Sequence, residues 1–396
     1  MKKLFLIPLL LVLVAALIFS GCTAQAPAGK VLKVGALYGL TGPGSEAQMG
    51  WRDVMLLCQD WINENGGIKV GGEQYQVQCI IEDHKQSPQG CIDAATKLVY
   101  QDGVQFLLGG VVPVQNEATT SVTEPKKVLY CAVKNDILYP DKPYFFVAYY
   151  SYAAPLPHLY DVTLQLYPNV KSIGFIIEDE AGAMAAAEGS QMIAKGLGLT
   201  LKEPHIHPWE APEYYPIWTK IIAEKPDAVD IGLKFPDGLA NCISQGRELG
   251  YDGPMFSGAG GGDPRLIIKM IGNNDYARDF IYGTFDPYGD NVPTMAQEVV
   301  KRWDATHKDP FDPDGTQQWD VLWMLKQVIE KAQSLDPTEV AKTWENIDTL
   351  ETALGPAKMG GEKSFGIKHM GFPPLAISRI QNGTIDFTKW VDSYMP

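Results

Sequence analysis

The sequence predicts an α/β protein with two doubly wound parallel-sheet lobes. Short apolar strands alternate with amphipathic helices along most of the 396 residues, an order typical of parallel sheets that carry helices on both faces. A chain of this length is also too long for one small core. The alternation starts afresh near Pro143–Tyr152, so we expect the chain to pass from one lobe to the other there.

The N-terminus carries the features of a secretory signal over residues 1–21. Two lysines precede an uncharged apolar run from Leu4 to Phe19, which is short for a membrane span. The sequence FSGC then resembles the lipobox of bacterial lipoproteins, although that motif usually has leucine where Phe19 stands. This resemblance implies a lipid on Cys22 and anchoring to the outer face of a bacterial membrane. The alternative is ordinary signal cleavage with Cys22 left as a free thiol. Residues 22–30 are small and polar, and we expect a flexible tether.

The first lobe begins with a strand over 31–37, followed by a glycine-rich loop and a helix over 49–64. Apolar side chains such as Val54, Trp61 and Ile62 recur at helical spacing in this segment. The glycine pair at 66 and 67 supplies the positive φ that ends a helix. Further strands are predicted over 75–83, 104–108 and 128–133, and further helices over 88–102 and 114–124.

The second lobe repeats the alternation with less regular spacing. The dipeptide Asn382-Gly383 near the C-terminus predicts a hairpin turn. Helices are predicted over 153–167, 181–197, 213–224, 237–249 and 265–272, and strands over 172–177, 199–206, 227–233, 254–257 and 280–285. A long helix is predicted further along the chain, over 314–333.

Composition and motifs argue against several functional classes. A net charge of −14 makes the chain a poor binder of nucleic acid. The patterns G-x-S-x-G, H-E-x-x-H and the P-loop do not occur, so we expect neither an enzyme nor a cofactor. His205 and His207 lie on one face of a strand without an evident third ligand, so we expect a solvated strand end and no metal. The acidic run 178–180 is expected to be a solvated loop.

Four stretches resemble the leucine/isoleucine/valine-binding family of type I periplasmic binding proteins, the receptors of ABC importers. They are LTGPGSEAQMGWRDVMLLCQDWINENGGI, EDHKQSPQGCIDAATKLVYQDGVQFLLGG, PDAVDIGLKFPDGLANCISQGRELG and QQWDVLWMLKQVIEKAQSLDPTEV. The resemblance implies a three-strand hinge, a solute bound in a cleft between the lobes, and closure by a hinge motion. It also implies permease subunits as partners, and we expect a monomer. The expected lobes are 30–147 plus 287–357 and 148–286 plus 358–396.

The positions that grip an amino acid in that family carry other side chains here. Counting within the motifs, the hydroxyl pair that holds the ligand carboxylate falls on Val112-Pro113. A second hydroxyl position falls on Asp136, with Lys134 two residues before it. The two acids that hold the ammonium fall on Tyr152 and Ala259, and two aromatic positions fall on Ala47 and Ala181. The alternatives are that Ala47 and Ala181 only start helices, that Lys134 is a solvated surface lysine, and that Tyr149, Tyr150 and Tyr152 pack the hinge.

These differences favour an apolar or aromatic carboxylate without an amino group. Burying an ammonium without an acidic partner costs several kcal/mol, about enough to abolish binding. Backbone N–H groups from Val114 onward and Lys134 or Lys234 can still attract an anion. Tyr150 and Phe235 would add aromatic surface.

Two alternatives to this interpretation stay open. One is an amino-acid receptor in which Asp136 holds the ammonium. The other is a sensor of the same fold that passes its signal to a membrane protein. The genes beside this one would separate transport from sensing.

One disulfide is predicted, between Cys58 and Cys79. Cys58 lies on the apolar face of the first helix, and Cys79 on the apolar face of a strand expected at the sheet edge. In an oxidising compartment a bond closing this loop would add roughly 3 kcal/mol. The alternative is a pair of unbonded core cysteines.

Overall fold

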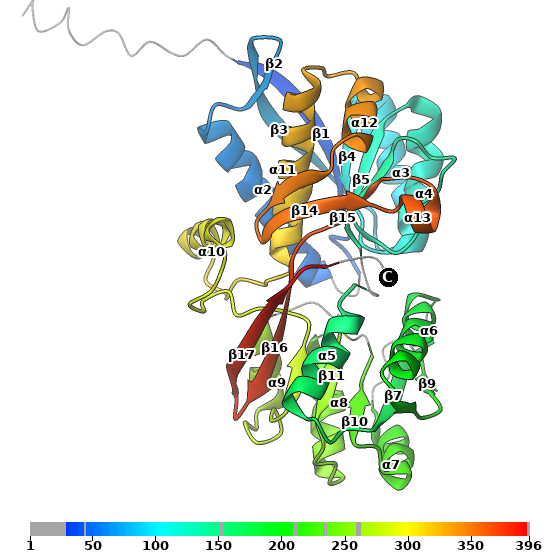
Figure 1. Ribbon diagram of the computed structural model, residues 1–396. Helices are drawn as coiled ribbons and strands as arrows, with labels where there is room; N and C mark the ends of the chain where they lie inside the picture. Colours follow the sequence, from blue (N-terminus) through cyan, green and yellow to red (C-terminus); the bar gives the residue numbers. More distant parts are fainter. Residues whose placement is uncertain are drawn as a thin grey trace, which may run out of the picture.

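The computed structural model describes residues 29–42, 45–150, 154–179, 181–208, 213–232, 234, 236–258 and 263–393. This part of the chain forms two α/β lobes, each built on its own mainly parallel sheet (Figure 1). The predicted fold class is therefore confirmed. The alternation of strands and helices in the sequence becomes the layered arrangement of both lobes.

The first lobe contains a nine-stranded sheet in the order β13-β14-β15-β6-β5-β4-β1-β3-β2. Its parallel centre consists of β1 (Lys30–Tyr38), β3 (Glu73–Asp83), β4 (Phe106–Gly109), β5 (Leu129–Asn135) and β6 (Phe145–Tyr150), with β15 (Met370–Phe372) beside β6. The antiparallel outer strands are β2 (Ile68–Val70), β13 (Thr349–Thr352) and β14 (Gly355–Gly360).

Helices cover both faces of this sheet and divide its core into two clusters. Trp319, Trp344 and Phe146 belong to the larger cluster, which lies under α2 (Ser45–Glu64), α10 (Thr294–Thr306), α11 (Gly315–Ala332) and α12 (Pro337–Glu345). The opposite face packs on α3 (Pro88–Thr96), its π-helical extension Lys97–Gln101 and α4 (Pro113–Thr123), which a short 3₁₀ turn, Glu124–Lys126, follows. The small helix α13 (Glu362–Phe365) joins β14 to β15.

The second lobe has its own sheet in the order β17-β16-β12-β11-β10-β7-β8, with β9 beside β7. Its strands are β7 (Ser172–Glu178), β8 (Thr200–Leu201), β9 (His205–His207), β10 (Ala228–Asp230), β11 (Met255–Ser257), β12 (Phe280–Tyr282), β16 (Leu375–Gln381) and β17 (Thr384–Val391). One face packs on α7 (Tyr215–Glu224), α8 (Pro236–Glu248) and α9 (Pro264–Ile271), and the other on α5 (Leu156–Leu166) and α6 (Ala181–Gly196).

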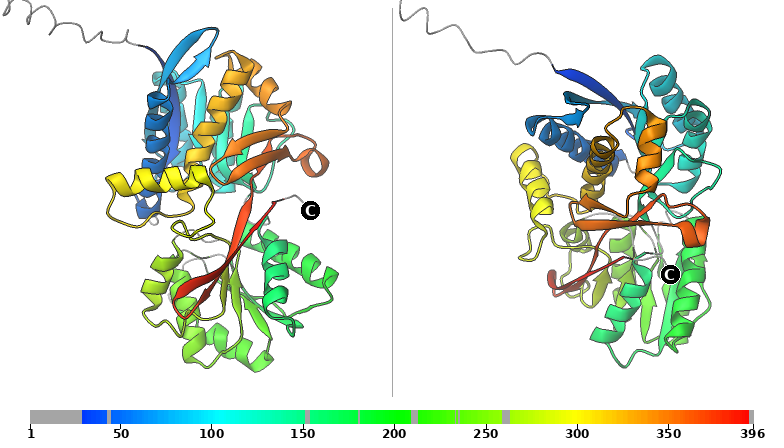
Figure 2. Two further views of the ribbon diagram at one scale, coloured as in Figure 1. Left: turned by 60° about the vertical axis from the view of Figure 1, so that its left-hand side comes forward. Right: turned by 45° about the horizontal axis from the view of Figure 1, so that its top comes forward.

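The chain passes between the lobes three times, after β6, after β12 and after β15. The last passage leads into the β16–β17 hairpin, which extends along one side of the second lobe (Figure 2). Its turn residues Asn382 and Gly383 have φ values of 52° and 77°, as expected for a tight hairpin turn.

Residues 358–372 belong to the first lobe and not to the second, where the sequence analysis placed them. The chain turns at Ala353-Leu354 so that β14 pairs back along β13. Met370 of β15 then pairs with Val147 of β6, and both side chains lie in the same core cluster. The strand β6 itself was not predicted, because this change-over segment was interpreted as hinge.

The disulfide was predicted on the expectation that the strand over 75–83 is an open sheet edge. The corresponding strand β3 is covered. Its first residues pair with β2. Further along, its outward N–H groups are taken by amide side chains of α2. Val77 N–H donates to Asn63 Oδ1 over 2.7 Å, and Cys79 N–H donates to Gln59 Oε1 over 2.7 Å.

The predicted disulfide is not formed, because Cys58 and Cys79 are both free thiols in the described structure. Cys58 of α2 is fully buried in the core. Burial raises the pKa of its thiol well above the usual value, and the nearby Cys79 raises this pKa further. Burial raises the pKa of Cys79 to about 12. Both thiols are therefore held protonated, and a protonated thiol is a poor nucleophile for disulfide exchange.

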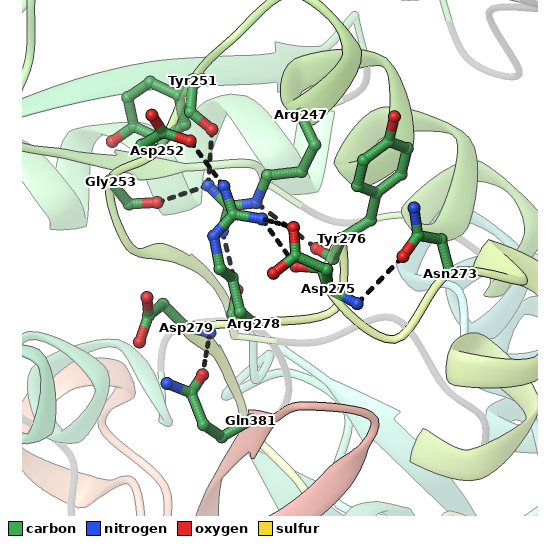
Figure 3. Close-up of polar contacts among 10 residues, drawn as sticks. All are labelled: Arg247, Tyr251, Asp252, Gly253, Asn273, Asp275, Tyr276, Arg278, Asp279 and Gln381. Carbon is green, nitrogen blue, oxygen red and sulfur yellow. Dashed lines mark hydrogen bonds and ion pairs between the residues drawn. The ribbon is translucent and has the colours of Figure 1, made fainter.

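A buried arginine in the last turn of α8 joins the loop before β11 to the segment before β12 (Figure 3). Arg247 is 5% exposed, and its guanidinium donates to the carbonyl oxygens of Tyr251, Gly253 and Arg278 over 2.7–2.8 Å. The Arg278 side chain lies closer to solvent and pairs with Asp252 and Asp275. Burial is the main reason why the pKa of Arg247 falls to about 10.

Candidate ligand-binding site

The carboxyl ends of both sheets face the opposite lobe. The strands β6 and β12 each run directly into a passage to the other lobe, so these ends of the parallel strands are turned toward each other. In doubly wound sheets, ligands bind at the carboxyl ends of the strands. The candidate site is therefore made of the residues that follow β4 and β5 in the first lobe and β7, β10 and β12 in the second.

The start of α4 lies at this edge, directly after β4. Val112 is the N-cap residue with φ −115°, and Pro113 occupies the first helical turn without a side-chain cap. Both are half-buried, whereas Val114 is 58% exposed. Gly110 must be glycine, because its φ is 83° and a Cβ would lie 2.1 Å from Asn116 Oδ1.

Buried asparagines hold this helix start against the end of β5. Asn116 is fully buried and donates from Nδ2 to the carbonyl oxygen of Lys134 over 2.8 Å. Tyr130 OH donates to Asn116 Oδ1 over 2.8 Å, and Val133 N–H donates to the Gly110 carbonyl. Asn116 was not predicted as a site residue, although a polar residue in the buried face of a helix is a recognisable signal.

The Lys134 ammonium forms an ion pair with Asp314 from the loop before α11, with Nζ and Oδ2 3.3 Å apart. Both side chains are about one-fifth exposed, at 20% and 21%. Next to them, Asp312 accepts a hydrogen bond from Trp51 Nε1 over 3.0 Å. Burial and then the charge of Asp314 raise the pKa of Asp312 to about 7. This cluster was missed because its members come from distant parts of the chain.

The same cluster reaches the second lobe. Tyr282, at the end of β12, is 2% exposed, and burial raises the pKa of its phenol well above the usual range. The carboxylates of Asp314 and Asp312 raise this pKa further. Because Tyr282 belongs to the second lobe, the Lys134–Asp314 pair lies where the two lobes meet.

A second charged cluster is buried at the facing edge of the second lobe. Glu178, at the end of β7, pairs with Lys234 over 2.5 Å, and His207 Nε2 lies 3.5 Å from the same oxygen. Glu178 is 1% exposed and His207 4%. Both were expected to be solvated, and that expectation was wrong. Lys234 also donates to the Ile231 carbonyl, so its ammonium is already occupied.

The remaining site predictions have different outcomes. Ala47 lies in the first turn of α2 and packs against the core, and Ala181 begins α6. Tyr150 ends β6 and contacts Phe372, with ring centroids 5.6 Å apart. Burial and the nearby Asp136 raise the pKa of Tyr150 to about 12. Four predicted positions lie outside the described residues, namely Cys22, Tyr152, Phe235 and Ala259.

Within the described ranges, no group of three or more His, Cys, Asp or Glu side chains is arranged to hold a metal ion. The helices of this same part of the chain include none that is both long and apolar enough to cross a membrane.

The fold and these facing edges agree with the sequence comparison. The profile of the family described as "Periplasmic binding protein" matches residues 31–384, so the chain belongs to this family. The family implies export and consists of solute receptors, which confirms the expectation that the chain is not an enzyme.

A curated relative shares a shorter segment. The leucine-, isoleucine-, valine-, threonine- and alanine-binding protein of Pseudomonas aeruginosa is 27% identical over 117 residues, which is 30% of this chain. The matched segment also spans only 30% of that relative's length.

Solved structures show the same fold over nearly the whole chain. The branched-chain amino acid transporter substrate-binding protein of Streptococcus pneumoniae, in complex with isoleucine, has a TM-score of 0.77 at 15% identity. The alignment covers 92% of this chain and 100% of that one. A solute-binding protein of R. palustris in complex with 4-hydroxybenzoate has a TM-score of 0.75 at 14% identity and covers 92% and 97%. At sequence identities this low, the similarity to these structures shows a shared fold.

Proposed function

We propose that this protein is the solute receptor of an ABC importer of the branched-chain amino-acid class. The observation that carries the proposal is the pair of facing sheet edges, each with charged groups, joined by three passages of the chain. Such an arrangement suits a solute held between two lobes that close by a hinge motion. The family and the named relatives support a receptor that delivers its solute to permease subunits.

The proposed ligand is a small apolar or aromatic carboxylate. The half-buried Val112 and Pro113 offer apolar surface beside Lys134, whose ammonium can attract an anion. Tyr150 adds an aromatic side chain on the same edge. The 4-hydroxybenzoate complex of the R. palustris protein shows that this fold accommodates such a molecule.

An amino acid is the second candidate ligand. The observation that favours it is the presence of Asp312 and Asp314 beside Lys134, because they supply negative charge that the sequence analysis did not expect there. A zwitterion could then find both signs of charge at one edge.

Calorimetry with the purified receptor tests the two candidates. We expect 4-hydroxybenzoate or benzoate to bind with a Kd of about 1 μM or tighter and leucine not to bind. Tight leucine binding that Asp136→Asn or Asp314→Asn abolishes would establish the amino-acid receptor instead. Native mass spectrometry of co-purified ligand is the independent check. If the neighbouring genes encode a membrane sensor and no permease, the protein is a sensor component.

The proposal includes a lipid anchor on Cys22, which the sequence FSGC supports. Two or three acyl chains give stable membrane attachment where one chain would be marginal. We expect Cys22→Ser to release the receptor from membranes into the soluble fraction, measured by fractionation and immunoblotting. Full retention of the variant on salt-washed membranes would contradict the anchor.

A further inference from the structure

The Lys134 ammonium, at the facing edges of the two sheets, can form more hydrogen bonds than the one it forms with Asp314. Among the described residues, its hydrogen-bond partner is Asp314, and the 3.3 Å separation is longer than the 2.7–2.9 Å typical of such charged pairs. An ammonium can donate three hydrogen bonds. Lys234 differs, because its Nζ has two partners at 2.5 Å and its side chain is 3% exposed. Lys134 can therefore accept a new anionic partner without first leaving a buried pair.

Asp314 is held more firmly than the lysine it contacts. Its Oδ1 accepts a hydrogen bond from Gln317 Nε2 over 3.0 Å, and its N–H donates to Asp312 Oδ1 over 3.1 Å. It also lies at the N-terminal end of the long helix α11. The carboxylate is thus fixed in place, whereas the Lys134 ammonium is joined to its backbone by a flexible stem.

We infer that Asp314 determines ligand specificity by competing with the ligand carboxylate for Lys134. A bound carboxylate must share or replace Asp314 at the ammonium, and it also meets the repulsion of the Asp314 charge. The aspartate therefore weakens the binding of every simple carboxylate. It selects ligands whose remaining surface supplies enough affinity to offset that loss. This inference rests on the proposed function, and within it assigns Asp314 a role that the family resemblance does not.

The test uses Asp314→Asn, which keeps an acceptor for Gln317 and removes the charge. We expect calorimetry to show 4-hydroxybenzoate binding about tenfold more tightly to this variant than to the wild type. The neutral analogue 4-hydroxybenzamide should change by less than about twofold. Asp348→Asn is the matched control, because it removes the same charge from an exposed pair with Lys368. It should leave both affinities unchanged.

A double-mutant cycle identifies the partner. In a Lys134→Met background, Asp314→Asn should lose the part of its gain that comes from releasing the ammonium and keep only the part that comes from relieved repulsion. Thermal melts of all variants check that each is folded.

The outcomes separate the inference from the proposed function. If Asp314→Asn weakens or does not change 4-hydroxybenzoate binding while the wild type binds it, the inference is wrong and the proposed function stands. If Asp314→Asn instead abolishes leucine binding, Asp314 is a contact of the ligand ammonium, and both the inference and the carboxylate assignment fall. If neither the wild type nor any variant binds a carboxylate, both the proposed ligand class and the inference are wrong.

Discussion

Gly110 follows β4 directly and lies against the buried Asn116 and Tyr130. We expect Gly110→Ala to cost more than about 3 kcal/mol, because the new Cβ would be 2.1 Å from Asn116 Oδ1 in addition to the strain of positive φ. Gly103→Ala is the control, since Gly103 has a φ of 71° with open space around it. It should cost about 1 kcal/mol. Urea denaturation measures both, and equal losses would contradict the role of Asn116.

Lys234 neutralises a carboxylate that has almost no access to water. We expect Lys234→Met to destabilise the second lobe by about 3–5 kcal/mol, because Glu178 would keep its charge in a buried site. Adding Glu178→Gln should recover part of the loss, since the unpaired charge is then removed. Lys368→Met, which breaks an exposed pair with Asp348, should cost less than about 1 kcal/mol. If the single and double variants are equally unstable in chemical denaturation, the ion pair is not the cause.

Single residues of the site were predictable only where a local pattern carried the information. The placement of Val112-Pro113 at a helix start followed from glycines after an apolar run, and the structure has Val112 as the N-cap. Glu178 and Lys234 lie far apart in the chain, so nothing local distinguished a buried ion pair from a solvated acidic loop. Whether the residues at the facing edges touch a ligand stays a prediction.

At the scale of elements, two helix–loop junctions of the second lobe depend on one side chain. Arg247 of α8 binds the loop before β11 and the segment before β12 through three carbonyl oxygens (Figure 3). We expect Arg247→Met to lower the free energy of unfolding by about 3 kcal/mol, because buried carbonyl groups would lose their donors. Arg278→Met removes only pairs near the surface and should cost less than about 1 kcal/mol. Equal effects in thermal denaturation would contradict this assignment.

Helices with regular apolar spacing were predicted closely, whereas one strand at the change-over between the lobes was missed. The helix expected over 49–64 is α2, and the hairpin around Asn382 is present. The strand β6, Phe145–Tyr150, is apolar throughout. It lies where the chain changes lobes, and without the alternation that marks a half-buried strand it was interpreted as hinge. The strand expected over 199–206 is broken into β8 and β9.

At the scale of the whole molecule, buried acids make stability depend on pH. Burial raises the pKa of Glu124, Asp230, Asp312 and Asp320 to about 7 in the folded state. Unfolded aspartates lose their protons near pH 4. The folded state thus holds more protons between these values, and the free energy of unfolding falls as pH rises from about 4 to 7. His369 opposes this below pH 6.5, because burial lowers its pKa to about 4. Burial also lowers the pKa of His84 and His158, which act in the same direction.

Chemical denaturation at pH 5.5 and 7.5 measures this balance. We expect lower stability at pH 7.5, because the four acids with raised pKa values titrate across this interval, whereas the buried histidines act below pH 6.5. Asp320→Asn should reduce the difference in the free energy of unfolding between the two pH values by the contribution of one carboxyl group. The amide that replaces this group does not titrate. A wild-type protein that is clearly more stable at pH 7.5 would contradict the assignment of these buried acids.

The order in which the chain contributes to the two sheets has a consequence for biosynthesis. The sheet of the first lobe includes β13 to β15, and the sheet of the second lobe includes β16 and β17 at the very end of the described chain. Neither sheet is complete until those last segments have left the ribosome. A chain that must thread through a secretion channel before folding is helped by such a late completion. The native sheets need these last strands, so the chain cannot complete its fold until synthesis is nearly finished.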